Sequence, residues 1–244
     1  MNSTLLECIN ITKEFEKENT RFTVLRDINL TVARGETVCI YGKSGAGKSV
    51  LLSLIAGIDR PTSGKLFFEN KETNILPSPQ LTLLRQNDIG IIFQNFNLIS
   101  YWTALENVEA VLTNGKNIDG KNHSAEHLLN ILGLSHRMKN YPSELSIGEQ
   151  QRVAVARTLC RNPKLIVADE PTGEVDEATS DIIIDLLMKS NRETGTALII
   201  TTHGHFPIER VDTVYGLING TLVNKQAVNE SPTKLFNAVI NARR

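Results

Sequence analysis

The sequence lacks three features that would define a protein class directly: a long apolar run, an excess of one charge and a paired-cysteine motif. Among its 244 residues, 26 basic side chains balance 27 acidic ones. This balance gives the chain no bulk attraction to nucleic acid or to an anionic membrane. The longest apolar-looking run, residues 51–58, is far shorter than the roughly 20 residues that cross a bilayer. Residues 1–15 show neither the basic region nor the apolar core of a secretory signal.

Disorder and a disulfide framework are excluded by composition. Hydrophobic residues make up 41% of the chain and charged residues 22%, which are ordinary values for a globular protein. The three cysteines, Cys8, Cys39 and Cys160, form no CxxC pair. Their odd number and the apolar run around Cys39 predict reduced, buried thiols, as in a cytosolic protein.

Short apolar runs alternate with helical patterns along most of the chain. Three runs are too short for surface helices and lack polar alternation, which is typical of strands buried on both faces of a parallel sheet: residues 89–93, 165–168 and 197–200. Helical patterns are expected at residues 125–132, 148–160 and 180–191. The alternation predicts an α/β fold.

Both ends and the middle of the chain depart from this alternation. Further strands are predicted at residues 5–12, 24–32 and 65–69, with the hydrophilic residues 13–21 connecting the first two. Residues 95–161 are mostly helical in pattern, and we interpret them as a helical lobe inserted into the α/β core. Residues 214–223 predict two final strands with Asn219-Gly220 as their hairpin turn.

A glycine-rich loop carries the clearest chemical signal. An apolar strand, residues 37–41, precedes it and a helix, residues 50–58, follows. The loop fits G-x-x-x-x-G-K-[ST] with Gly42, Lys43, Ser44, Gly45, Ala46, Gly47, Lys48 and Ser49. Glycines let successive N–H groups face phosphate oxygens, and the helix N-terminus adds its positive end. Lys48 supplies a charge to the β- and γ-phosphates, and the Ser49 hydroxyl suits Mg²⁺.

Phosphate binding alone does not distinguish kinases, GTPases and motor ATPases. The alternative interpretation of the loop is a glycine-rich turn with an incidental lysine and no bound phosphate. Two carboxylates follow the buried strand at residues 165–168, where open α/β sheets bind ligands. Asp169 is placed to hold Mg²⁺ through its water shell. Glu170 is placed to polarise the attacking water as a general base. Without the glycine-rich loop earlier in the chain, a non-catalytic acidic turn would explain Asp169 and Glu170 equally well.

Two further polar residues follow predicted buried strands. His203 comes after the strand at residues 197–200, where an imidazole would hydrogen-bond the γ-phosphate or the water. Gln94 follows Phe93, and its amide suits a metal ligand or the water. Each is a weak signal by itself, because a lone histidine is more often structural.

Together these residues resemble the nucleotide-binding subunit of ATP-binding cassette (ABC) transporters. Residues 42–49 look like its Walker A motif, Gln94 like its Q-loop, residues 165–170 like its Walker B motif, Asp176 like its D-loop aspartate and His203 like its switch histidine. Most specific is the segment Leu145-Ser146-Ile147-Gly148-Glu149-Gln150-Gln151-Arg152, which is similar to the LSGGE-QQR signature that other P-loop proteins lack. The motifs occur in family order across nearly the whole chain.

Two stretches look like one branch of the family. Residues 93–98 and 103–108 are similar to the lipoprotein-release and macrolide-exporter branch, which includes the ATPase of the cell-division complex. Pro171-Thr172-Gly173 is similar to the same branch. The resemblance thus implies an ATPase that powers a membrane-embedded export, lipoprotein-release or mechanotransmission complex.

The resemblance implies an α/β fold with a P-loop NTPase (RecA-like) core. Residues 1–94 and 162–244 would form this core with an N-terminal antiparallel β subdomain. Residues 95–161 would form the inserted α-helical subdomain. The whole chain would be a single ABC ATPase domain, peripheral on the cytoplasmic face of the cell membrane.

In the family, two cassettes face each other head to tail around two ATP, and a homodimer is expected here. Ser146 and the Gly148 N–H would meet the γ-phosphate bound to the opposite subunit. Phe15 matches the aromatic position that stacks on adenine. The alternative is that Phe15 is a partly exposed aromatic residue at the end of a strand, with no contact to nucleotide. The implied catalytic residues are Glu170, His203 and Gln94; the ATP contacts are Phe15, Gly42, Lys43, Ser44, Gly45, Ala46, Gly47, Lys48, Ser49, Val50, Ser146, Gly148, Glu149 and Asp176; the Mg²⁺ ligands are Ser49, Gln94 and Asp169.

The chain departs from the family pattern at several positions. Ile147 occupies the first glycine of the signature pair, where a β-branched residue would resist a positive φ and crowd the opposite phosphate. Glu174-Val175 replaces the commoner asparagine-leucine, and Gly204 replaces an aspartate. None of these changes removes a catalytic group, so an active ATPase is expected, slowed if Ile147 hinders closure.

A membrane partner is expected to bind near residues 94–102. Residues 96–102 are apolar for a loop and include the single tryptophan. Two interpretations of these residues are equally supported. They would line a groove for a coupling helix, or they would fill the core of the helical lobe.

Three other classes of function are considered for this sequence. A soluble cassette acting on DNA or ribosomes would usually carry a coiled-coil insertion or second cassette, and nucleic acid is not expected as a partner. A nucleotide-gated scaffold with little hydrolysis is the main alternative. A metabolite kinase conflicts with the signature motif.

Overall fold

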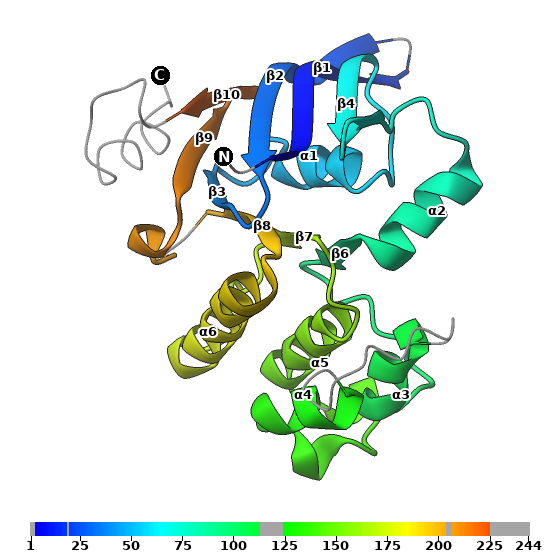
Figure 1. The fold of residues 1–244 in the computed structure, drawn as a ribbon, viewed down its shortest axis with the longest axis vertical. Helices are drawn as coiled ribbons and strands as arrows, with labels where there is room; N and C mark the ends of the chain where they lie inside the picture. Colours follow the sequence, from blue (N-terminus) through cyan, green and yellow to red (C-terminus); the bar gives the residue numbers. More distant parts are fainter. Residues whose placement is uncertain (1–2, 19, 113–123, 204–205, 225–244) are drawn as a thin grey trace.

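Two sheets and their covering helices form the molecule (Figure 1). The computed structural model describes residues 3–18, 20–112, 124–203 and 206–224. Gly204, whose departure from the family pattern is noted above, lies outside these residues. Within the described ranges, every helix is too short or too polar to span a lipid bilayer.

The first sheet is antiparallel and comes mostly from the N-terminal part of the chain. Its strand order is β2-β1-β4-β5, with bounds Thr20–Ala33, Thr4–Lys17, Ser63–Phe68 and Lys71–Glu72. The prediction that residues 13–21 connect two strands was wrong for most of that stretch. Pairs such as Glu14↔Thr23 and Lys17↔Thr20 continue the hairpin nearly to its tip. Because this end of the hairpin is exposed, it keeps backbone pairing while carrying charged side chains.

The second sheet has parallel strands at its centre, as the buried apolar runs predict. Its order is β10-β9-β3-β8-β7-β6, with bounds Thr221–Asn224, Thr213–Ile218, Thr37–Tyr41, Ala197–Thr202, Leu165–Asp169 and Ile89–Ile92. Only β10 pairs antiparallel, through the predicted hairpin at Asn219-Gly220. The carboxyl ends of β3, β7 and β8 therefore lie side by side at one edge.

Residues alternate along β3 between two separate hydrophobic cores. Val38 and Ile40 belong to the core shared with the antiparallel sheet and helix α1, Lys48–Ile55. Cys39 and Tyr41 belong to the core under α5, Ile147–Leu159, and α6, Glu177–Thr194. Burial on both faces explains the apolar run without alternation. Cys8, Cys39 and Cys160 are buried and form no disulfide among the described residues, as predicted, and burial raises the pKa of the Cys160 thiol to about 11.

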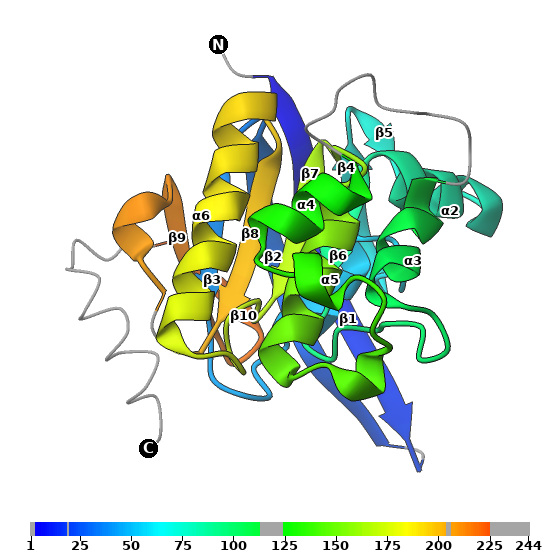
Figure 2. The ribbon, with the colours of Figure 1, turned by 90° about the horizontal axis from the view of Figure 1, so that it is seen from below.

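The helices between β6 and β7 pack together on one side of the parallel sheet, below it in Figure 1 and in front of it in Figure 2. They are α3, Ala104–Glu109, α4, Ala125–Ile131, and α5, joined by short 3-10 turns at Ala110–Leu112, Ser135–Arg137 and Pro142–Glu144. Another 3-10 turn, Ile208–Arg210, precedes β9. Helix α2, Ser78–Asn87, precedes β6 and was not predicted, because Leu81 is its only buried residue. The predicted helices at residues 148–160 and 180–191 have shifted ends, and residues 56–58 lie outside α1.

Candidate ATP site

The loop between β3 and α1 presents an array of unused backbone donors. Gly45 and Gly47 have φ values of +78° and +101°, which L side chains rarely adopt. Gly42 N–H donates to Thr202 O and Ala46 N–H donates to Lys43 O. The N–H groups of Gly45, Gly47, Lys48 and Ser49 have no acceptor among the described residues. Such convergent donors at a helix N-terminus form a phosphate-binding cradle.

Lys48 begins α1 but directs its ammonium group back over the loop. Its side chain is 5% exposed, and Nζ donates to the carbonyl oxygens of Gly42 at 2.8 Å and Lys43 at 3.1 Å. Nζ also lies 3.1 Å from Oε1 of Glu170. A buried ammonium needs such partners, because an unpaired charge is costly out of water.

Glu170 joins the ammonium group of Lys48 to the imidazole of His203. Its side chain is 9% exposed, and its Oε2 lies 2.6 Å from Nδ1 of His203. The Glu170 backbone adopts φ 50°, a left-handed conformation that is uncommon for a non-glycine residue. A hydrogen bond from its N–H to Thr201 O at 3.1 Å holds this conformation. The structure thus brings together the residues predicted from the loop, from β7 and from β8.

The predicted metal ligands lie around the same edge of the sheet. Asp169 is the last residue of β7 and accepts a 2.6 Å hydrogen bond from Oγ1 of Thr201. Ser49 in α1 and Gln94 after β6 are exposed. A hydroxyl, an amide and a carboxylate supply the oxygen atoms that Mg²⁺ prefers, so the residues present fit that ion.

Phe15 lies near the tip of the β1–β2 hairpin rather than in the loop. Its ring stacks on Phe22 with centroids 5.9 Å apart, and Lys13 Nζ lies 4.9 Å from the Phe15 centroid. Phe15 is 36% exposed and Phe22 is 47% exposed. An exposed aromatic surface of this kind suits stacking on a purine, and Phe22 is a ring that the sequence analysis missed.

A cavity of about 530 Å³ opens beside the loop. Residues 43–46 form one wall, and Phe22 and Gly220 line others. The Nζ atom of Lys43 is buried and has no hydrogen-bond partner among the described residues. The loop therefore holds a second cation beside Lys48 whose charge the described residues leave unpaired.

The signature residues form the N-terminus of α5. Ser146 is the N-cap, and its Oγ accepts from Glu149 N–H while Glu149 Oε2 accepts from Ser146 N–H at 2.7 Å. Glu149 also pairs with Arg137, 2.9 Å from Nε to Oε1. The hydrogen bond from the Ser146 backbone, helped by Arg137, lowers the pKa of the Glu149 carboxyl group. The predicted ATP contact Glu149 is thus occupied in capping its own helix.

The α5 N-terminus nevertheless keeps free backbone donors. The N–H groups of Ile147 and Gly148 find no acceptor within the described residues. A β-carbon on Gly148 would lie 3.7 Å from both Thr179 and Val175, so the first turn of α5 lies close to the start of α6. The donors are therefore available to an anion that approaches from outside.

The concern about backbone strain at Ile147 was wrong. Ile147 is the first helical residue of α5 and is absent from the residues with positive φ. Its side chain is 52% exposed. A β-branched residue is tolerated here because the capping residue is Ser146, so bulk is the remaining difference from glycine.

Asp176 caps α6 in the same manner. Its Oδ1 accepts from Thr179 N–H at 3.0 Å and its Oδ2 from Thr179 Oγ1 at 2.8 Å. The first of these bonds lowers the pKa of the Asp176 carboxyl group. Arg152 of α5 donates to Thr179 Oγ1, which ties the two helix N-termini together.

The two groups of predicted residues remain separate in one chain. Among the described residues, no hydrogen bond or ion pair joins Ser146, Gly148 or Asp176 to the loop at residues 42–49. Gln151 Nε2 instead donates to Pro171 O at 2.8 Å, linking α5 to the segment after Glu170. The described residues thus present unused N–H donors in two groups, one in the loop and one at the N-terminus of α5.

This geometry defines the class of protein as a P-loop nucleoside triphosphatase. Its marks are a strand followed by a glycine loop with a buried lysine, and a carboxylate on a neighbouring parallel strand. The family model for ABC transporters matches residues 25–173, more than half of the chain. The chain belongs to the ABC transporter family and is one of its ATP-binding, ATP-hydrolysing cassettes.

Curated relatives and solved structures agree with this assignment. The chain is 40% identical to the lipoprotein-releasing system ATP-binding protein LolD of Wigglesworthia glossinidia brevipalpis, over 92% of this chain and 98% of that protein. It is 42% identical to LolD of Geobacter metallireducens, over 91% of this chain and 99% of that protein. A dimeric structure of the ATP-binding cassette MJ0796 with ADP and Pi has a TM-score of 0.83 at 35% identity, covering 89% of this chain and 96% of that one.

Proposed function

We propose that two copies of this chain close around two ATP molecules and drive a membrane complex of the lipoprotein-releasing type. The observation that carries the dimer is a second set of unused donors, the N–H groups of Ile147 and Gly148 beside the exposed Ser146, for which the described residues of the same chain provide no acceptor. Support also comes from the LolD relatives and from the dimeric form of MJ0796. The cassette would act at the cytoplasmic face of the membrane.

The loop half would bind the triphosphate of its own chain. Phe15 would stack on adenine, and residues 42–50 would wrap the phosphates with their free N–H groups and Lys48. Ser49, Gln94 and Asp169 would hold Mg²⁺, which neutralises phosphate charge when bound. Residues 1–94 and 162–244 would make up the core and β subdomain, and residues 95–161 the helical subdomain.

The helix half would bind the γ-phosphate of the partner's ATP. Ser146 Oγ and the N–H groups of Ile147 and Gly148 would donate to it, and Asp176 would lie at the same interface. Glu149 would act by positioning Ser146 rather than by touching the nucleotide. ADP lacks the γ-phosphate, so closure would depend on ATP.

Hydrolysis would begin with a change of partners at Glu170. The β- and γ-phosphates compete for the ammonium group of Lys48, which now lies 3.1 Å from Glu170 Oε1. The carboxylate is then available to accept a proton from the attacking water, while His203 holds Oε2 from the other side. If Lys48 moves from Glu170 to the phosphates when ATP binds, nucleotide binding would free the Glu170 carboxylate to act as the general base.

Reconstitution tests this function and separates it from the nucleotide-gated scaffold. The chain is incorporated with LolC/E-type membrane subunits into proteoliposomes, and lipoprotein release and ATP turnover are measured. We expect release that requires ATP and stops with Glu170→Gln. Release that persists with Glu170→Gln would favour the scaffold, and no ATP-dependent release would contradict the proposed function.

A further inference from the structure

One threonine of β8 contacts both carboxylate residues at the end of β7. Thr201 lies directly opposite Asp169 in the parallel ladder of these two strands. Its hydroxyl donates to Oδ1 of Asp169 at 2.6 Å, and its backbone carbonyl accepts from the N–H of Glu170 at 3.1 Å. Thr201 therefore meets the predicted Mg²⁺ ligand through its side chain and the predicted general base through its backbone.

The contact between the hydroxyl and the Asp169 carboxylate is a strong hydrogen bond. A hydroxyl that donates to an ionised carboxylate typically lies about 2.5–2.7 Å from it, and this pair falls in that range. The carbonyl oxygen of Ala168 lies 3.4 Å from the same hydroxyl, which is a much weaker contact. Thr201 is 0% exposed, so water does not compete for its proton. The carboxylate oxygen is thus the principal acceptor of this hydroxyl.

Thr201 makes this hydrogen bond from a fixed position. Its backbone pairs with Ile40 of β3 on one side and with Asp169 of β7 on the other, so it lies inside the parallel sheet. Glu170 is held differently, because Lys48 contacts its carboxylate from the end of the glycine loop and would move to the phosphates when ATP binds. The ladder thus gives Asp169 a donor that does not depend on the side-chain contacts of Glu170.

A fixed carboxylate suits the requirements of Mg²⁺. This ion demands near-octahedral geometry and usually keeps several of its water molecules. Thr201 engages Oδ1 of Asp169, which leaves Oδ2 for the ion or for a water molecule bound to it. Without the hydroxyl, the Asp169 side chain is free to change rotamer, and ordering it again lowers the affinity for the ion.

We infer that Thr201 is a positioning residue for Mg²⁺, whose hydroxyl orients the Asp169 carboxylate and thereby sets how strongly the ion supports nucleotide binding. This inference rests on the role proposed above for Asp169 and adds the residue that prepares Asp169 for it. Thr201 acts through Asp169 and is not itself a ligand. The sequence analysis assigned Thr201 no role, because only the pairing of β7 with β8 brings the two side chains together.

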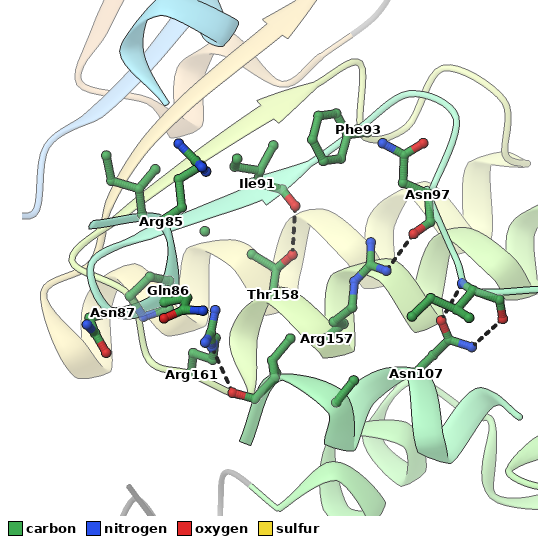
Figure 3. Close-up of a pocket in the computed structure, with 16 residues that line it drawn as sticks. Arg85, Gln86, Asn87, Ile91, Phe93, Asn97, Asn107, Arg157, Thr158 and Arg161 are labelled. Atoms are coloured by element: carbon green, nitrogen blue, oxygen red, sulfur yellow. Dashed lines mark hydrogen bonds between the residues drawn. The ribbon is translucent and has the colours of Figure 1, made fainter. Parts of the chain in front are cut away.

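Thr158 shows how a buried threonine serves structure alone. Figure 3 shows this residue of α5, whose hydroxyl donates to the carbonyl oxygen of Ile91 at 3.0 Å. The carbonyl oxygen of Ala154 also lies 3.0 Å away, and Thr158 is 6% exposed. Both acceptors are backbone carbonyls, so removing this hydroxyl releases no carboxylate. Thr158→Val is therefore a matched control for Thr201→Val, because each change removes a buried hydroxyl and keeps a β-branched side chain.

The contribution of Mg²⁺ to nucleotide affinity tests the inference. Calorimetry measures the affinity for a non-hydrolysable ATP analogue in EDTA and in excess MgCl₂, and the ratio of the two affinities reports the coupling between metal and nucleotide. We expect Thr201→Val to lower this ratio by about 10-fold while its affinity in EDTA stays at the parental value. Thr158→Val should keep the parental ratio. Thermal unfolding checks that each variant folds.

Thr201→Ser separates the hydroxyl from the packing of the side chain. Serine keeps the donor and loses only the methyl group, so this variant should keep most of the ratio that Thr201→Val loses. The inference is overturned if Thr201→Val has the parental ratio, or if the serine and valine variants lose it equally. It is also overturned if Thr201→Val loses affinity equally with and without Mg²⁺, which is the result of a purely structural role.

Asp169→Asn distinguishes a failure of this inference from a failure of the proposed function. A ratio that falls with Asp169→Asn and stays parental with Thr201→Val contradicts the role of Thr201 alone. A parental ratio for Asp169→Asn, or a parent whose affinity does not respond to Mg²⁺, contradicts the proposed metal role of Asp169 and this inference together.

Discussion

The two halves of the proposed ATP site are built in opposite ways. The loop half buries its charges: Lys48 and Glu170 are 5% and 9% exposed and neutralise each other 3.1 Å apart. The helix half exposes its groups, because Ser146 and Asp176 lie at the surface as caps of α5 and α6. Its carboxylates, Glu149 and Asp176, are bound within their own first turns or to Arg137.

The difference indicates what each half waits for. In the loop half, Lys48 already has a carboxylate partner without nucleotide, so ATP would exchange that partner for a phosphate, while Lys43 offers a charge that no described residue pairs. The carboxylates of the helix half are held in place by its own residues, and the N–H groups of Ile147 and Gly148 have no acceptor among the described residues. Under the proposed function, these donors would bind a phosphate held by the second cassette.

The largest effect is expected from removing the base of the loop half. Glu170→Gln should lower ATP turnover by about 10²–10⁴-fold, because the amide cannot accept the proton of the attacking water. Nucleotide binding should persist, and the ATP-bound dimer should accumulate in light scattering after gel filtration. Glu174→Gln, at an exposed position nearby, is the matched control. Turnover at the parental rate would contradict the assignment of Glu170.

Removing the ammonium group should mainly affect binding. Lys48→Ala should weaken ATP affinity by roughly 10- to 100-fold, the value of a hydrogen bond to a charged group. Isothermal titration calorimetry measures this against Lys65→Ala, which removes an exposed lysine of β4. Equal affinities for the two variants would show that the loop does not use Lys48.

In the helix half, a smaller and pH-dependent effect is expected. Glu149→Ala should destabilise the chain by about 0.3–1.5 kcal/mol at pH 7, because it removes the capping box of α5. The folded-state pKa of Glu149 lies below its ordinary 4.5. Its contribution is therefore present above pH 4.5 and is lost as the pH falls through the lower folded value. Thermal unfolding from pH 7 to 3 should show the two midpoints converging, and a constant gap would exclude this origin.

The smallest effect concerns Ile147. Since its backbone is already helical, Ile147→Gly should promote ATP-driven dimerisation of the Glu170→Gln background no more than Ile147→Ala does. Both remove the branched side chain from the helix N-terminus, and they differ by one methyl group. Sedimentation velocity with Mg-ATP compares them. A gain specific to glycine would mean that the dimer requires a positive φ at this position.

Local chemistry made much of the loop half predictable from sequence. The strand β3, the glycine loop and α1 follow from a pattern in which each residue type has one physical reason. Burial on both faces explained β6, β7 and β8 equally well. The order of motifs then led to the signature at α5 through family resemblance.

What escaped prediction depends on contacts between distant residues. The pairing of Lys48 with Glu170 joins positions far apart in the chain, and the sequence assigned each a separate role. The capping bonds of Glu149 and its pair with Arg137 were not predicted either, because they arise only once α5 is formed. The polar helix α2 has a single buried residue, Leu81, and so gives no apolar stripe from which a helix could be predicted.

Complementation between two defective chains tests most directly whether each ATP site takes one half from each chain. Lys48→Ala damages the loop half and Ser146→Arg damages the helix half, so neither chain alone should hydrolyse ATP. Their mixture contains heterodimers in which intact Lys48 of one chain faces intact Ser146 of the other. The account predicts that the mixture regains ATP turnover at one site per heterodimer. A mixture as inactive as its components would contradict it.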